Sequence, residues 1–144
     1  MLEQKGLSDT EIEQYFTPAG ERSWHGHEVA DSLRHPEFET QKSYISDGCG
    51  GYVECPYGTA GAQRPDMIHF MEDGVEIRED KVYHDVANLT NNIKQQAADR
   101  YELWGDSLKD LTFAVADTGF TIEEAERIYE ACDKAGADVE FVRK

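Results

Sequence analysis

The feature that most constrains the fold is a pair of alternating runs in RPDMIHFMEDGVEIRED, residues 64–80. Apolar and polar residues alternate on both sides of Asp73-Gly74, a pair suited to a type I′ turn. Successive side chains of a strand point to opposite faces, so Glu76 and Arg78 share one face of the second run. The sequence therefore predicts a β-hairpin that carries an acid and a cation on one face.

Periodicity and end signals predict the other elements. Helices are expected at residues 7–16, 27–38, 85–105 and 121–136. Further strands are expected at residues 43–46, 51–55, 110–117 and 138–142. A meander followed by β-α-β-α-β predicts an α/β (α+β) fold with a single mixed β-sheet flanked by helices. We expect one domain over residues 1–144, with a lead-in helix in 1–20 and the core in 26–142.

Charge limits the range of partners. The chain of 144 residues has 30 acidic and 14 basic residues and a formal net charge of −16. A surface this acidic repels nucleic acid at long range and favours cations and basic proteins. The three cysteines give no disulfide framework, and no stretch approaches the ~18 apolar residues of a membrane span, so no membrane partner is expected.

The hairpin suggests a cation site. Asp66 begins the first strand and Glu76 lies near the start of the second, so their carboxylates could hold Mg²⁺, Mn²⁺ or another divalent cation. Arg78, on the same strand face as Glu76, could stabilise charge that develops on a phosphate. Asp66 as turn chemistry and Glu76–Arg78 as a solvated strand face are the simpler interpretations.

Pro65-Asp66, nine residues and then Glu76-Ile77-Arg78 resemble the PD-(D/E)XK nuclease signature. The element order resembles the restriction-endonuclease-like core αβββαβ, with an acid, Glu28, on the helix before the meander. The chain is most similar to the C-terminal nuclease toxin domains of polymorphic and contact-dependent growth inhibition systems. There a helix of NN…Q…R character follows, as in NNIKQQAADR here. The resemblance covers roughly residues 26–142.

The resemblance implies a set of site residues. Asp66 and Glu76 would ligate the metal, and Glu28 would be an accessory ligand, directly or through water. Gln96, or less favourably Gln95, would face the site from the following helix.

One position departs from the signature, because Arg78 stands where the family has a lysine. Arginine binds phosphate well but does not readily give up its proton. Either Arg78 acts only electrostatically, or Lys94 or Lys81 substitutes, or the domain is inactive. Lys81 ranks below Lys94 because it does not share a strand face with Glu76.

The expected function is therefore metal-dependent cleavage of DNA or RNA such as tRNA, with a cognate immunity protein as a possible partner. In that case the domain is exported as part of a larger toxin and works in the target-cell cytoplasm; otherwise it is a cytoplasmic protein. The alternative is a non-catalytic acidic interaction domain, either a degenerate nuclease fold or an immunity-type inhibitor. A metal-free ribonuclease that uses histidines is a third, weaker possibility.

Overall fold

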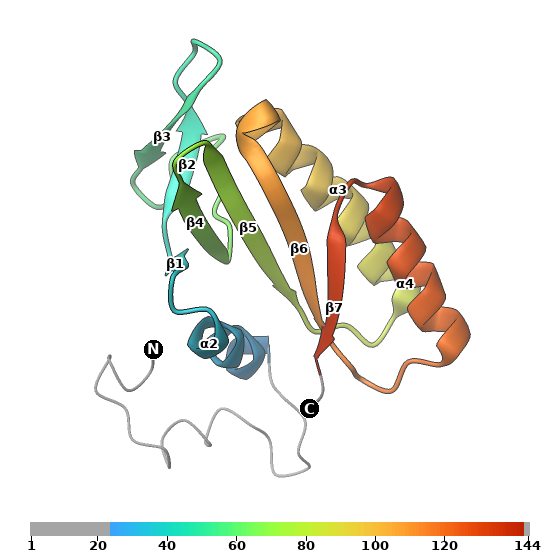
Figure 1. Cartoon of the computed structure of the whole chain (residues 1–144). Coiled ribbons are helices and arrows are strands. Elements are labelled where there is room, and N and C mark those ends of the chain that lie inside the picture. The colour runs from blue at the N-terminus through green and yellow to red at the C-terminus, as the bar shows by residue number, and fades with distance from the viewer. Residues whose placement is uncertain (1–23, 143–144) are drawn as a thin grey trace.

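The computed structural model describes residues 24–142, and the side chains from Val29 onward. Figure 1 shows the arrangement of the elements. The helices are α2 (Trp24–Arg34), α3 (Val86–Trp104) and α4 (Ile122–Lys134), with a 3₁₀ turn, η1, at Gly105–Ser107. The strands are β1 (Glu39–Thr40), β2 (Ser43–Ser46), β3 (Tyr52–Cys55), β4 (Met67–Met71), β5 (Gly74–Lys81), β6 (Leu108–Ala116) and β7 (Asp138–Val142). The expected helix at residues 7–16 lies outside the described residues.

The main sheet is mixed and has five strands in the order β1-β4-β5-β6-β7. The pairs β1–β4 and β4–β5 are antiparallel, whereas β5–β6 and β6–β7 are parallel. This confirms the predicted mixed sheet flanked by helices. One detail differs, because β2 and β3 pair with each other in a separate two-stranded sheet.

The β4–β5 hairpin forms as predicted, but its turn lies one residue earlier. Met71 pairs with Gly74, so the two turn residues are Glu72 and Asp73. Neither has a positive φ, so the type I′ turn expected at Asp73-Gly74 is wrong. Gly74 instead begins β5 at a close approach, because a Cβ there would lie 2.2 Å from the carbonyl oxygen of Ser107. The glycine is required by packing rather than by the turn.

The core lies between the sheet and helices α3 and α4. The three- and four-residue spacing of apolar residues in this helix predicts a buried stripe of Val86, Leu89, Ile93, Ala97, Tyr101 and Trp104. All of these are buried except Tyr101, which is exposed. The buried residues pack with Ile77 of β5, Phe113 of β6 and Ile128 of α4 in one apolar cluster. Figure 1 shows α3 and α4 side by side along the sheet.

Helix α2 lies against the opposite face of the sheet. Its Asp31 contacts Arg78 of β5, whereas the next residue of that strand, Glu79, contacts Arg100 of α3. Consecutive strand residues face opposite sides, so α2 and α3 enclose β5 between them.

Candidate functional site

The last four residues of β5, Arg78, Glu79, Asp80 and Lys81, are all charged and all buried. Charged side chains are rarely buried unless they are paired or have a function. Arg78 and Asp80 face α2, whereas Glu79 and Lys81 face α3. The sheet therefore carries two charged clusters, one on each side of the same strand.

On the α3 side, Asp66 is fastened to the end of β5. The Asp66 amide donates to Glu79 Oε1 at 3.2 Å, and the Asp80 amide donates to Asp66 Oδ2 at 2.8 Å. The register explains the contact, because Met67 pairs with Arg78 and the preceding residue therefore lies beside Glu79. The backbone amide of Asp66 thus meets the Glu79 carboxylate, and the Asp66 carboxylate meets the Asp80 amide, where β4 begins and β5 ends.

Arg100 of α3 neutralises Glu79. Its Nε lies 2.6 Å from Glu79 Oε2, and both side chains are almost fully buried. The same guanidinium donates through Nη1 to Gln63 Oε1 at 2.6 Å, and Gln63 Nε2 donates to the Asp99 carbonyl at 2.6 Å. Glu79 is therefore held by a chain of hydrogen bonds that links β5 to α3 and to the segment before β4.

Lys81 shares the strand face of Glu79. It is only 7 % exposed, and its Nζ lies 6.0 Å from the centre of the Phe113 ring. Burial lowers the pKa of Lys81 below its ordinary value, while the charges of Glu79 and Asp66 act in the opposite direction. Burial therefore favours the neutral form of Lys81, the form that can accept a proton, more than it would in an exposed lysine.

Amide side chains of α3 continue the polar character of this region. Gln96 lies one helical turn before Arg100, and Asn92 one turn before Gln96, so the three share one side of the helix. The side-chain oxygens of Asn92 and Gln96 are buried and have no hydrogen-bond partner among the described residues. Buried acceptors without donors are uncommon and are the kind of group that water or a cation satisfies.

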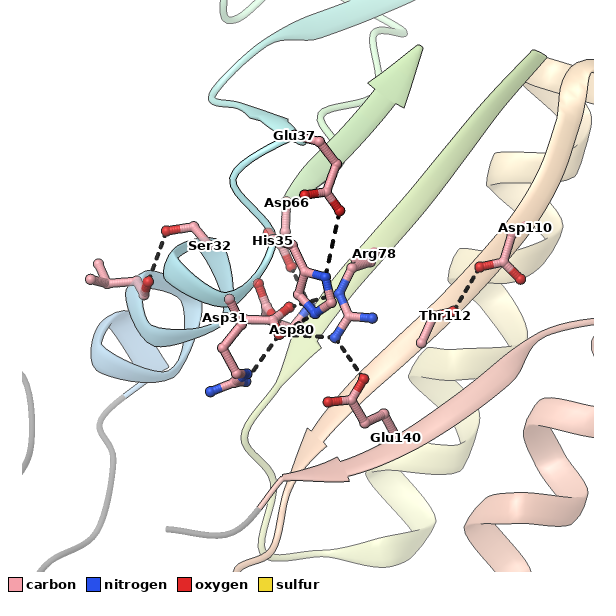
Figure 2. A network of polar contacts seen from close by, with 12 residues as sticks. Asp31, Ser32, His35, Glu37, Asp66, Arg78, Asp80, Asp110, Thr112 and Glu140 are labelled. Carbon is pink, nitrogen blue, oxygen red and sulfur yellow. Dashed lines mark hydrogen bonds and ion pairs between the residues drawn. The ribbon is translucent and has the colours of Figure 1, made fainter. Parts of the chain in front are cut away.

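On the α2 side, Arg78 is held at both ends of its guanidinium group. Its Nε and Nη2 donate to Asp31 Oδ2 and Oδ1 at 3.1 and 2.9 Å, and Nη2 also donates to Glu140 Oε2 at 3.0 Å. Figure 2 shows Arg78 between these two carboxylates. A bidentate pair of this kind is among the strongest hydrogen-bonded ion pairs in proteins.

Asp31 is fully buried yet remains ionised. Burial acts to raise its pKa, but hydrogen bonds from Asp80 and Arg78 outweigh it and hold the pKa at about 2. Because this value is below the usual 3.8, the pair stabilises the fold above pH 3.8 and loses that contribution as the pH falls toward 2. The Asp31–Arg78 pair therefore docks α2 on the sheet throughout the neutral range.

Asp31, His35 and Glu140 form the one group of three potential metal ligands found among the described residues, with ligand atoms within 4.8 Å of one another. Arg78 already bonds both acids of this group, and Arg34 Nη2 lies 3.0 Å from Asp31 Oδ1. Two guanidinium groups supply the positive charge that a metal would bring. This cluster is better described as the ion-pair network that holds α2.

The structure separates Glu76 from Asp66. Glu76 pairs with His69, and its carboxylate lies 3.6 Å from the Nδ1 atom of that residue. Three residues of strand, roughly 10 Å, separate position 69 from Asp66. Glu76 also faces the side of β5 opposite to Glu79, so the expected Asp66–Glu76 pair does not form.

The remaining predicted positions are distributed as follows. Arg78 is engaged by Asp31 and Glu140 instead of facing an open site. Lys94 lies on the exposed side of α3, away from Asp66. Gln96 lies on the side of α3 that bears Arg100, with its oxygen buried. The backbone of Glu28 lies in α2, but its side chain lies outside the described part of the chain.

Glu79 is the residue that sequence reasoning missed. The spacing Glu79-Asp80-Lys81 is itself an E-x-K pattern, and it follows Pro65-Asp66 along the same hairpin. Lys81 does not share a strand face with Glu76, but it does share one with Glu79. Both Glu76-Ile77-Arg78 and Glu79-Asp80-Lys81 can be read from the sequence. Only the register of the hairpin shows that Glu79, and not Glu76, lies beside Asp66.

Comparison with protein-family models, with curated proteins and with solved structures found no match. Within residues 24–142, none of the helices combines the length and apolar character needed to span a bilayer.

Proposed function

We propose that the chain is a metal-dependent phosphodiesterase that cleaves nucleic acid, with Asp66, Glu79 and Lys81 as its reactive group. One observation carries the proposal. Asp66 contacts Glu79 and the Asp80 amide at the strand ends, and Lys81 lies on the same face as Glu79. Two carboxylates and a buried lysine at such a junction are the groups that this chemistry requires.

The donor set fits a hard divalent cation. Asp66 and Glu79 offer carboxylate oxygens, which Mg²⁺ and Mn²⁺ prefer. The buried oxygens of Asn92 and Gln96, which lack donors among the described residues, add polar groups on the neighbouring helix. Arg100 holds Glu79 Oε2 at 2.6 Å, so a cation that binds this oxygen must replace the guanidinium. A bound cation would polarise the phosphate and lower the pKa of a water molecule.

The protein's own groups have separate tasks. Asp66 and Glu79 would hold the cation, which would supply the positive charge that positions the reacting phosphate. Lys81 can accept a proton from the attacking water, because burial lowers its pKa. Arg100, once released from Glu79, is a fixed cation near the phosphate. Arg78 stays with Asp31 and maintains the packing of α2.

The experiment tests whether cleavage depends on Glu79 or on Glu76, two acids of β5. Purified protein is incubated with plasmid DNA and with total tRNA in Mg²⁺ or Mn²⁺. We expect cleavage of at least one substrate by the unmodified chain and by Glu76→Gln. We expect no cleavage by Asp66→Asn or Glu79→Gln, which keep the shape of the side chains. Cleavage that survives Glu79→Gln but not Glu76→Gln would support Glu76 as the partner of Asp66 and would reject Glu79 in that role.

Metal binding is tested separately from cleavage. A ligand present at 100 times its dissociation constant stabilises a fold by about 2.7 kcal/mol. We therefore expect millimolar Mg²⁺ or Mn²⁺ to raise the melting temperature of the unmodified chain and of Glu76→Gln, but not that of Asp66→Asn. An equal shift in all three proteins would place the cation elsewhere.

A second candidate is a non-catalytic interaction domain. The observation that favours it is that Arg100 pairs with Glu79 and Arg78 pairs with Asp31, so both clusters are neutralised internally. A net charge of −16 then suits a basic protein partner. This candidate predicts no cleavage of either substrate with either metal, and capture of a basic partner that a chelator does not release.

A further inference from the structure

A hollow between α3 and α4 concentrates positive charge on this acidic protein. The groove has a volume of about 370 Å³ and is lined by residues of both helices, among them Asn91, Lys94, Arg127, Glu130 and Lys134. Figure 1 shows the two helices packed side by side. Its size falls in the range of about 300–1,000 Å³ that is typical of ligand pockets.

The distribution of cations singles out this groove. Residues 24–142 contain ten lysines and arginines, of which Arg78, Lys81 and Arg100 are buried. Of the seven others, Lys94, Arg127 and Lys134 line the groove, together with one acid, Glu130. The groove therefore has a local formal charge of +2, from three cations and one acid, on a chain with a net charge of −16.

These three cations are not neutralised within the described chain. Arg34 and Lys42 form ion pairs with acids at 3.0 and 2.9 Å. Glu130 lies three residues after Arg127 and four before Lys134, the spacings at which helical ion pairs form. Even so, no ion pair of Lys94, Arg127 or Lys134 forms in the described part of the chain.

The helix dipole explains the position of one of these three cations. Lys134 lies in the last turn of α4, where a cation is favoured by the helix dipole. Lys94 is in the middle of α3 and Arg127 is in the middle of α4, so the dipole does not explain them. Their convergence across two helices calls for a partner with negative charge.

We propose that the groove between α3 and α4 binds phosphate groups. Arg127 offers a planar fork that matches phosphate oxygens, Lys94 and Lys134 offer point charges, and the exposed Asn91 amide offers neutral donors. A nucleotide and the backbone of a nucleic-acid strand both present this oxyanion, and the test below distinguishes the two sources. The groove is distinct from the Asp66–Glu79 site, and the inference stands without the proposed cleavage activity.

The test measures binding in a chelator, so that no metal-dependent cleavage occurs. The probes are inorganic phosphate, adenosine monophosphate and a short single-stranded oligodeoxynucleotide, each added to the full chain. We expect Lys94→Gln combined with Arg127→Gln to weaken binding about tenfold or more, because two charged donors are lost. Lys109→Gln removes an exposed cation outside the groove and should leave the affinity unchanged.

The outcomes separate the two phosphate sources. The oligonucleotide result supports a nucleic-acid backbone under two conditions. Its binding must weaken as the salt concentration rises, and the double variant must lose part of this salt dependence. Saturable binding of phosphate or the nucleotide, with no gain for the oligonucleotide, supports a small phosphate ligand. Absence of binding by all three probes overturns the proposal, as does an equal loss of affinity in Lys109→Gln.

Discussion

The guanidinium of Arg78 and the carboxylate of Asp31 are joined by two hydrogen bonds of 3.1 and 2.9 Å across the boundary between β5 and α2. Figure 2 shows that the arginine expected to face a phosphate is enclosed by acids of its own chain. This arrangement makes Arg78 a structural residue. The cation that shares a strand face with Glu79 is instead Lys81, on the opposite side of β5.

The first prediction concerns the docking of α2. Asp31→Asn leaves the Arg78 charge buried with only the half-exposed Glu140 as a partner. Removing one member of a buried ion pair lowers the free energy of unfolding by about 3–5 kcal/mol. Urea denaturation followed by circular dichroism measures the loss.

Glu140→Gln is the matched control for Asp31→Asn, because it contacts the same nitrogen of Arg78. The Glu140 side chain is 45 % exposed. Water screens such a pair, so the expected loss is at most about 1 kcal/mol. Equal losses in the two variants would show that burial of Asp31 does not strengthen the pair.

Local signals allowed most elements to be predicted from the sequence. The capping box of Thr121 and Glu124, which begins α4, forms with both of its hydrogen bonds. The buried stripe of α3 follows the predicted spacing from Val86 to Ala97 and again at Trp104, although Tyr101 is exposed. Both features depend on residues within one or two helical turns, so the sequence contains them completely.

The candidate site depended on register, which the sequence left open. A turn centred on Asp73-Gly74 would place Asp66 opposite Lys81, whereas the observed turn places it beside Glu79. In the observed register Gly74 is part of β5 and lies close to Ser107, a residue distant in the chain, where a Cβ would lie 2.2 Å from the Ser107 carbonyl oxygen. A contact of this kind cannot be inferred from the residues of the hairpin alone.

The second prediction concerns pH. Asp110 of β6 lies on the α2 side of the sheet with Glu76, and burial together with a hydrogen bond to Asp138 raises its pKa to about 6. A raised pKa in the folded state means that this group stabilises the fold below pH 3.8 and loses that contribution as the pH rises through 6. Asp110→Asn should therefore raise the melting temperature at pH 7.5 more than at pH 5.

Differential scanning calorimetry of the unmodified chain and of Asp110→Asn at both pH values checks this. Glu126→Gln, which removes an exposed acid of α4, corrects for the general relief of negative charge. If both variants raise the melting temperature equally at pH 7.5, net charge rather than the Asp110–Asp138 contact explains the effect.

The third prediction tests the close approach at the start of β5. Gly74→Ala places a Cβ 2.2 Å from the Ser107 carbonyl oxygen, so the backbone of η1 or of β5 must move. Overpacking of this kind lowers stability by about 1–3 kcal/mol. Gly51→Ala is the control, because the atom it meets is the far end of the flexible Asp47 side chain. Chemical denaturation should show a clearly larger loss for Gly74→Ala, and equal losses would contradict the packing argument.

The last prediction separates a functional from a structural role of Lys81. A buried lysine whose pKa is lowered destabilises the fold at neutral pH, since burial disfavours its charged form more than the nearby charges of Glu79 and Asp66 favour it. Lys81→Met should therefore leave the melting temperature unchanged or raise it, while cleavage in Mg²⁺ or Mn²⁺ is lost. Lys81→Arg keeps the charge but cannot give up a proton, so it should also be inactive. The cleavage rate of the unmodified chain should rise with pH until Lys81 is deprotonated. If Lys81→Arg cleaves at the unmodified rate with the same pH profile, Lys81 is not the proton acceptor.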